Sequence, residues 1–130
     1  MRRQSRKRRE RMDAVRDDRQ AYLFAHGNKC IWCDSTWNVA VHEIARGMNR
    51  NAALSEPSCW LPLCGPCNCG PFHNRAIWPD AKQMALKYLR DNVNYDLVRF
   101  NYIVNPRAPN RVTQDEVDFY VKELISGRIC

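Results

Sequence analysis

Two C-x-x-C pairs constrain this chain more than any other feature of its sequence. The first pair is Cys30 and Cys33, and the second is Cys64 and Cys67. Two residues between the cysteines let both sulfurs of a pair turn toward one ion at about 2.3 Å, and two such pairs complete a tetrahedral Zn²⁺ site. The spacing therefore predicts a structural zinc site that staples the chain between residues 30 and 67. A second register, in which Cys69 replaces Cys67, is left open.

The use of cysteine also indicates a compartment. The chain has seven cysteines in 130 residues, and the Arg-rich start is not followed by the apolar run of a signal peptide. No stretch approaches the ~20 apolar residues of a membrane span. We therefore expect an intracellular, cytoplasmic protein in a reducing environment, with no membrane partner, whose cysteines bind metal rather than form disulfides. Cys59, Cys69 and Cys130 are expected to be buried or free thiols.

Positive charge is concentrated at the start of the chain. The formal net charge is +7, yet residues 1–11 hold one acidic residue, Glu10, and seven basic ones, so the other 119 residues carry only +1. The basic residues are Arg2, Arg3, Arg6, Lys7, Arg8, Arg9 and Arg11. A basic arm on a near-neutral body is typical of nucleic-acid binding, and the alternative is a solvated tail or a localisation signal. We expect residues 1–10 to be frayed when the protein is alone.

Periodicity predicts an α+β fold with one domain over residues 12–130 and a core over residues 28–90. The expected helices cover residues 11–26, 79–90 and 94–104, with a last one between residue 113 and Gly127, and the expected strands cover residues 36–44 and 59–63. Gly27 should end the first helix in a left-handed conformation. Thr113 and Glu116 form a capping box for the last helix.

The same pattern predicts which side of each helix is buried. In the first helix, Met12, Val15, Tyr22 and Leu23 should face the core, with Arg16 and Arg19 among the solvated residues. In the helix after Pro79, the expected buried stripe is Ala81, Met84, Ala85, Tyr88 and Leu89, and Lys82, Lys87 and Arg90 should lie outside. His26 is interpreted as a helix-end residue rather than a metal ligand.

The middle of the chain resembles the zinc-stapled members of the HNH nuclease family. The residues that carry the resemblance are Cys30, Cys33, His42-Glu43-Ile44, Gly47, Arg50, Leu63-Cys64, Cys67-Asn68 and His73. The resemblance implies a small ββα-metal core in which a β-hairpin and a helix hold a divalent ion. A four-cysteine zinc site would pin this core, and helices from both termini would flank it. The family's central Asn falls near Cys59, where this chain has a thiol.

The resemblance also implies a reaction, the hydrolysis of DNA phosphodiester bonds with low sequence specificity. His42 and Glu43 would supply the general base and one ligand of a catalytic ion, Mg²⁺, Mn²⁺ or another divalent ion, in either order. An imidazole base suits neutral pH, and a carboxylate suits Mg²⁺. Asn68 and His73 would complete the site. These two residues are five positions apart, about 140° on an ideal helix, so a break at Gly70-Pro71 or the use of His73 alone is required.

Arginines next to the predicted catalytic strand add to the expected DNA contacts. Arg46 and Arg50 follow the strand, and a forked guanidinium suits two phosphate oxygens. DNA is the expected partner, within a larger nucleoprotein or packaging complex where one exists, and the oligomeric state is left open. The alternative function is a non-catalytic zinc-ribbon DNA-binding or adaptor protein, which the thiol at Cys59 favours. An RNA-binding zinc module is disfavoured because exposed aromatic strands are lacking.

Overall fold

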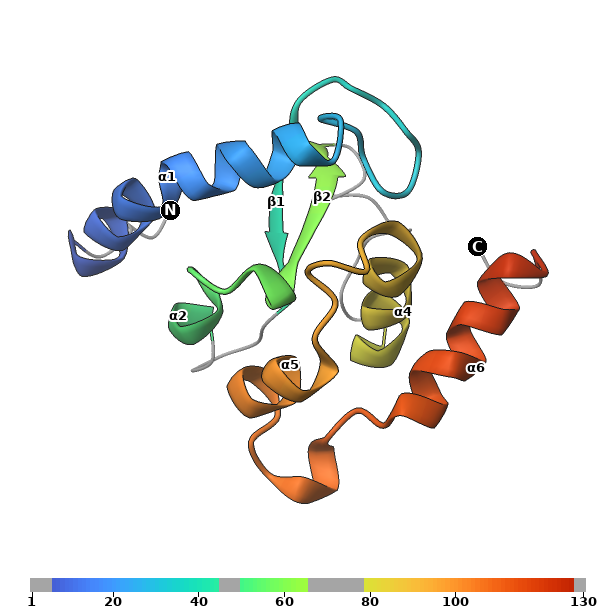
Figure 1. Ribbon diagram of the computed structural model, residues 1–130. Helices are drawn as coiled ribbons and strands as arrows, with labels where there is room; N and C mark the ends of the chain where they lie inside the picture. The colour runs from blue at the N-terminus through green and yellow to red at the C-terminus, as the bar shows by residue number, and fades with distance from the viewer. Residues whose placement is uncertain (1–5, 45–49, 66–78, 128–130) are drawn as a thin grey trace.

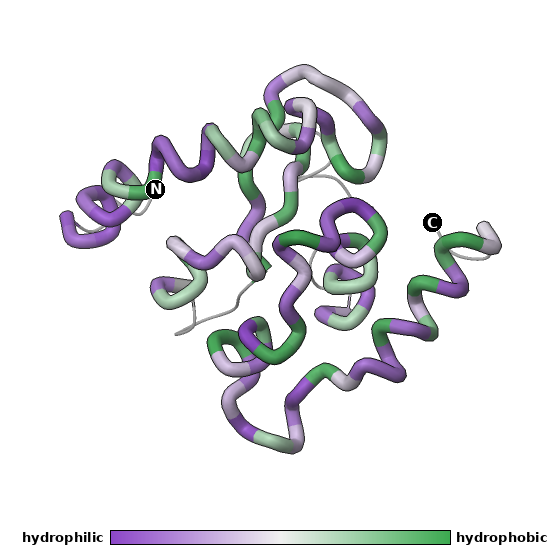
Figure 2. The backbone as a smooth tube through the Cα atoms, viewed as in Figure 1, coloured by the Kyte–Doolittle hydropathy of each residue, from purple (hydrophilic) through white to green (hydrophobic). Residues whose placement is uncertain are grey.

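The fold is α+β, with α-helices gathered around one two-stranded sheet (Figure 1). A computed structural model describes residues 6–44, 50–65 and 79–127. Within these residues, five α-helices and two strands are present. No helix in these ranges combines the length and the apolar character that crossing a bilayer requires. Hydrophobic segments converge on the sheet, while the first turns of the N-terminal helix are hydrophilic (Figure 2).

Helix α1 (Arg6–Ala25) begins five residues before the predicted start, so the predicted boundary between a basic arm and a domain falls inside a helix. Val15 and Tyr22 are buried, as the periodicity predicted. Gly27 has φ 68° and ends the helix, which confirms the predicted left-handed cap. The Gly27 N–H donates to Phe24 O at 3.0 Å and the Asn28 N–H to Leu23 O at 2.8 Å, the two bonds of a Schellman motif.

Strands β1 (Val39–Glu43) and β2 (Trp60–Cys64) pair antiparallel, with His42 opposite Leu61 and Glu43 opposite Trp60. Each strand lies within one residue of its predicted span except at the start of β1, which begins three residues later. Successive residues of a strand point to opposite faces, and opposed residues share a face. His42 therefore lies on the face of the buried Leu61, and Glu43 lies on the face of Trp60.

The connection between the strands and the C-terminal third are helical. The elements are α2 (Arg50–Ala53), η2 (Pro57–Cys59), α4 (Asp80–Arg90), α5 (Leu97–Val104), η5 (Ala108–Asn110) and α6 (Gln114–Ile125). Helix α6 runs alongside α4 (Figure 1), and α5 contacts α2 and the η2 turn. Leu61, Met84, Phe100 and Val117 are fully buried and join these elements into one core.

The ends of α6 confirm the sequence prediction. The Glu116 N–H donates to Thr113 Oγ1 at 3.1 Å, and the Thr113 N–H donates to Glu116 Oε1 at 3.3 Å, so both bonds of the capping box are present. Gly127 ends the helix with φ 72°. These features depend on residues three or four apart, which is why the sequence alone was sufficient.

The predicted faces of α4 were partly wrong. Ala81, Met84 and Ala85 are buried as predicted, but the lysines expected outside, Lys82 and Lys87, are 9% and 0% exposed. Tyr88 and Leu89, expected inside, are 39% and 43% exposed. Helix α4 packs along α6, and Lys87 donates to the Pro57 carbonyl of the η2 turn. A lysine stem is therefore covered on this helix, and its ammonium must find a partner.

Candidate metal centre

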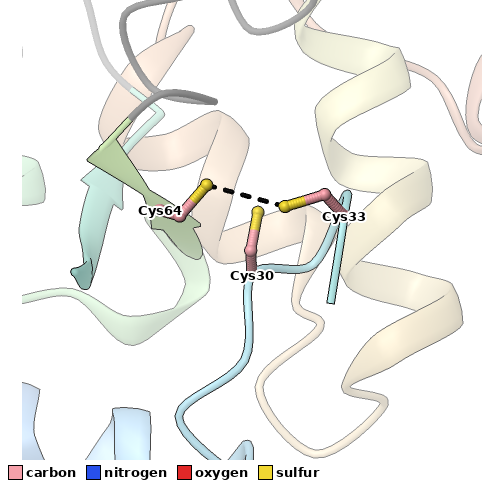
Figure 3. A group of neighbouring side chains, drawn as sticks. All are labelled: Cys30, Cys33 and Cys64. Atoms are coloured by element: carbon pink, nitrogen blue, oxygen red, sulfur yellow. Dashed lines mark hydrogen bonds between the residues drawn. The ribbon is translucent and has the colours of Figure 1, made fainter. Parts of the chain in front are cut away.

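Three cysteine sulfurs face one another at the end of β2 (Figure 3). The Sγ atoms of Cys30, Cys33 and Cys64 all lie within 4.8 Å of one another, and Cys33 Sγ is 3.6 Å from Cys64 Sγ. Two sulfurs bound at 2.3 Å to one tetrahedral ion are about 3.8 Å apart, whereas a disulfide requires about 2.05 Å. No disulfide links Cys30, Cys33 and Cys64 to one another. Their spacing is that of metal ligands and not of a disulfide.

Local backbone structure brings the first pair of cysteines to β2. The chain leaves α1 through the Gly27 cap, and the Ile31 N–H then donates to Pro62 O at 2.8 Å, which docks the first knuckle on β2. Within the knuckle, the Asp34 N–H donates to Cys30 O at 3.0 Å, and Asp34 has φ 60°. The turn thus places both sulfurs of this pair on the side of Cys64.

Gly65 closes the strand beside the second pair. Its N–H donates to Asn38 O at 3.0 Å, and a Cβ at this position would lie 2.6 Å from Asn38 Nδ2. A side chain at residue 65 therefore displaces the Asn38 side chain. Because this atom is the end of a flexible side chain, a larger residue at position 65 costs only a shift of Asn38.

The donor set suits a soft or borderline ion such as Zn²⁺. Cys30 and Cys64 are 0% and 2% exposed, so deprotonating them without a cation would leave charge in an apolar site, and a bound cation offsets this cost. Three of the four predicted zinc ligands are therefore together. Cys67, the fourth, and Cys69, its alternative, lie outside the described residues, as does Cys130.

Cys59 takes no part in this cluster. It is fully buried in the core, and burial raises the pKa of its thiol to about 12. A thiol with so high a pKa stays protonated at neutral pH and is a poor nucleophile. The prediction of a buried, free thiol at this position is confirmed.

The two residues predicted to carry the chemistry on β1 lie on opposite faces of the sheet. His42 is partly buried and lies opposite Leu61 in the register. Glu43 faces α1, where its carboxylate is 2.7 Å from the Arg19 guanidinium and 3.4 Å from that of Arg8. The Glu43 side chain is only 11% exposed. The carboxylate is thus engaged by two cations from the neighbouring helix.

Other predicted site residues cannot be compared with the structure. Asn68 and His73 lie outside the described residues, as do Arg2, Arg3, Arg46 and the side chain of Arg50. Among the described cations of the basic segment, Arg6, Lys7 and Arg9 are exposed. Arg8 is different, because its guanidinium donates to Asn51 Oδ1 at 3.1 Å and to the Glu43 carboxylate, within the body of the protein.

The ion pairs of Arg19 were not predicted from the sequence. Arg19 was expected on the solvated side, yet its side chain is 14% exposed. Its guanidinium donates to Leu54 O at 2.9 Å and lies 5.3 Å from the centre of the Trp60 ring. The positions 8, 12, 15, 19, 22 and 26 are separated by steps of three and four, so extending the apolar stripe through its polar members would have indicated this face.

A second buried polar group was also missed, at the ends of α1 and α4. His26 Nε2 lies 2.8 Å from Asp91 Oδ2, and both side chains are at most 8% exposed. Burial acts to raise the pKa of Asp91, but hydrogen bonds from Asn94 and the contact with His26 outweigh it, and the pKa is lowered. His26 is therefore a structural residue at the helix end, as the sequence indicated, and is not part of the cysteine cluster.

Comparisons of the chain with protein-family profiles, with curated protein sequences and with solved structures find no match.

Proposed function

We propose that this protein is a metal-dependent endonuclease of the HNH type that hydrolyses DNA phosphodiester bonds. The observation that carries the proposal is the junction of the cysteine cluster with the antiparallel pair. Cys64 ends β2, opposite Val39 of the strand that bears His42 and Glu43. Asn68 and His73 follow Cys64 within nine residues of sequence. A metal held by the cysteines would restrict where that segment can run relative to His42.

The reaction needs a base for the attacking water and charge stabilisation at the phosphate. His42 is the residue suited to accept the proton, since an imidazole titrates near neutral pH. A bound Mg²⁺ or Mn²⁺ would supply the charge stabilisation for the phosphate and for the leaving 3′ oxygen. Zinc would be structural. Phosphates of the DNA would be bound by exposed cations at the start of α1.

A second function, a non-catalytic zinc-containing DNA-binding or adaptor protein, is favoured by one observation. Glu43, for which the family resemblance implies a role as base or ligand, is engaged by Arg8 and Arg19. A carboxylate held by two guanidiniums is a poor base and has fewer lone pairs to offer a cation. A protein with this second function would use the cysteine site and the basic helix to bind DNA but would not cleave it.

Plasmid nicking separates the two functions. Protein loaded with zinc and freed of other ions by gel filtration is incubated with supercoiled plasmid, with and without added Mg²⁺ or Mn²⁺, and zinc content is measured in each sample. Nicking that requires the added ion while zinc content stays constant supports the nuclease. Binding of the plasmid without nicking under every ion condition supports the adaptor.

His42→Ala is the decisive variant, because a positioned general base contributes about 10²–10⁴-fold to rate. The variant should keep its zinc and its melting temperature and lose nicking by that factor. The nuclease proposal is refuted by a correctly folded His42→Ala protein with wild-type nicking.

A further inference from the structure

One face of α1 packs against the rest of the protein through polar as well as apolar residues. Val15 and Tyr22 are buried, and the Tyr22 hydroxyl donates to Trp60 O at 2.9 Å. Arg19 lies between these two residues on the same stripe, and Arg8 continues the stripe two turns before Val15. Both guanidiniums meet at Glu43. A single strand residue therefore binds this helix at two points separated by three turns.

Glu43 is well enclosed at this junction. Its side chain is 11% exposed, and those of Arg19 and Arg8 are 14% and 18% exposed. Ion pairs at this level of burial are screened less by salt than surface pairs, and removing one partner leaves the other charge uncompensated. Loss of the carboxylate would leave two guanidiniums in a partly buried site, which favours release of the N-terminal half of α1 from the sheet.

The ion pairs of Arg8 and Arg19 with Glu43 determine which cations of α1 lie on its outer surface. Arg6, Lys7, Arg9 and Arg11 are exposed, and one acidic residue, Glu10, lies among them and pairs with Arg6 at 3.0 Å. With Arg8 turned inward, its neighbours on either side are turned outward. The first turns of α1 extend beyond the sheet and are hydrophilic (Figures 1 and 2). On the helix, Lys7 and Arg11 lie about 40° apart on one flank and Arg9 lies on the opposite flank, so these cations are complementary to the phosphates on the two sides of a duplex groove.

We propose that Glu43 is a positioning residue that, through Arg8 and Arg19, holds α1 so that Lys7, Arg9 and Arg11 form a fixed docking surface for duplex DNA. The proposal rests on the proposed function and refines it. Glu43 is then neither the base nor a ligand of the catalytic ion, and His42 is the residue of this strand pair that faces the reaction.

The prediction separates binding from turnover. Glu43→Gln keeps an oxygen acceptor but removes the charge that pairs with two guanidiniums. We expect the Kd for a 20-base-pair duplex to rise about tenfold at constant salt, because fewer cations reach phosphates together. At saturating DNA, kcat should stay within about twofold of the wild-type value, and the affinity for Mn²⁺ should be unchanged. A residue that acts only on substrate binding changes neither kcat nor the affinity for the metal.

Arg8 and Arg9 provide a matched pair of variants on adjacent residues. Arg8→Ala removes an inward cation and should lower the melting temperature, as Glu43→Gln does. Arg9→Ala removes an outward cation and should leave the melting temperature unchanged, while the slope of log Kd against log salt falls by about 1. Glu10→Ala, which removes an exposed carboxylate from the same helix, controls for the change in net charge.

The outcomes are distinct. A Glu43→Gln protein that binds duplex normally but loses kcat more than about 100-fold, or loses Mn²⁺ affinity, assigns Glu43 to the reaction and overturns the proposal. Equal effects of Arg8→Ala and Arg9→Ala on both melting and salt slope also overturn it, and this comparison stands even if Glu43→Gln does not fold. If the wild-type protein never nicks DNA, the nuclease proposal fails, while the Kd and melting measurements still decide the positioning role.

Discussion

Lys87 offers a prediction whose size can be worked out from its surroundings. This lysine is 0% exposed on α4, and its ammonium donates to the Pro57 carbonyl and lies 6.0 Å from the Tyr22 ring. Burial, only partly offset by Asp91, Cys59 and Glu56, lowers its pKa from 10.5 to about 8. At neutral pH the folded protein therefore carries a buried charge that the unfolded chain would leave in water.

The sign follows from proton linkage. Between pH 8 and pH 10.5 the unfolded lysine keeps its proton while the folded one has lost it, so stability rises with pH through this window. At pH 7 the charge costs about 3 kcal/mol, since one pKa unit corresponds to 1.36 kcal/mol. Relative to a protein without this amine, the wild-type protein should gain about 1 kcal/mol of unfolding free energy from pH 7 to pH 9.

Lys87→Met supplies that reference protein. The variant avoids the buried charge but leaves the Pro57 carbonyl without its donor, a cost of about 1–3 kcal/mol, so its stability at pH 7 should equal or exceed that of wild type. Urea unfolding of both proteins, followed by the fluorescence of the buried Trp60, is measured at pH 7, 8 and 9. Lys122→Met controls for the loss of one positive charge at an exposed site. If the unfolding free energies of wild type and Lys87→Met change by the same amount between pH 7 and pH 9, the reasoning is refuted.

Other predictions follow from the same contacts. Cys33→Ser and Cys64→Ser should each reduce bound zinc, measured by elemental analysis, from one ion per chain toward none at equal protein and zinc concentrations. Arg19→Ala should lower the unfolding free energy by about 3 kcal/mol because Glu43 loses its nearer partner, whereas Arg16→Ala, at an exposed site, should change it by less than about 0.5 kcal/mol. Thr113→Ala should cost about 1 kcal/mol in the same urea assay, through loss of the α6 cap. Gly65→Ala should lower stability and zinc affinity only slightly, because its Cβ would meet the end of the Asn38 side chain, which can move aside; a large loss of zinc affinity would contradict this.

The parts of this protein that the sequence predicted are those that depend on near neighbours. The caps at Gly27 and Thr113, the alternation in β1 and the grouping of Cys30 with Cys33 each involve residues at most four positions apart. The approach of Cys64 to this pair was also predicted, because tetrahedral ligation links distant knuckles through one ion. A cap or a metal site that depends on a few residues at fixed spacings can therefore be inferred from the sequence alone.

Arg8, Arg19 and Lys87 show what the sequence alone left undetermined. Helical periodicity assigns charged residues to the solvated side, and this rule fails wherever a neighbouring element supplies a partner for the charge. Glu43 and the Pro57 carbonyl are such partners, and both lie more than twenty residues away along the chain from the cation they meet. The residues near each cation in the sequence therefore do not indicate its distant partner.

The same distribution of charge explains why a metal matters to this fold. A two-stranded sheet alone is marginally stable, and here much of its α1 face is held by ion pairs and hydrogen bonds instead of apolar contacts. Such contacts specify position but contribute little net free energy, because each charge must first be desolvated. A zinc ion bound by Cys30, Cys33 and Cys64 would tie the end of α1 to β2 at the opposite end of the strand pair from Glu43. We therefore expect removal of zinc to loosen α1 even where its ion pairs are intact, and hydrogen exchange of the Tyr22 and Leu23 amides with and without a zinc chelator measures this: equal protection in both states would mean that the cysteine cluster is not what secures the helix.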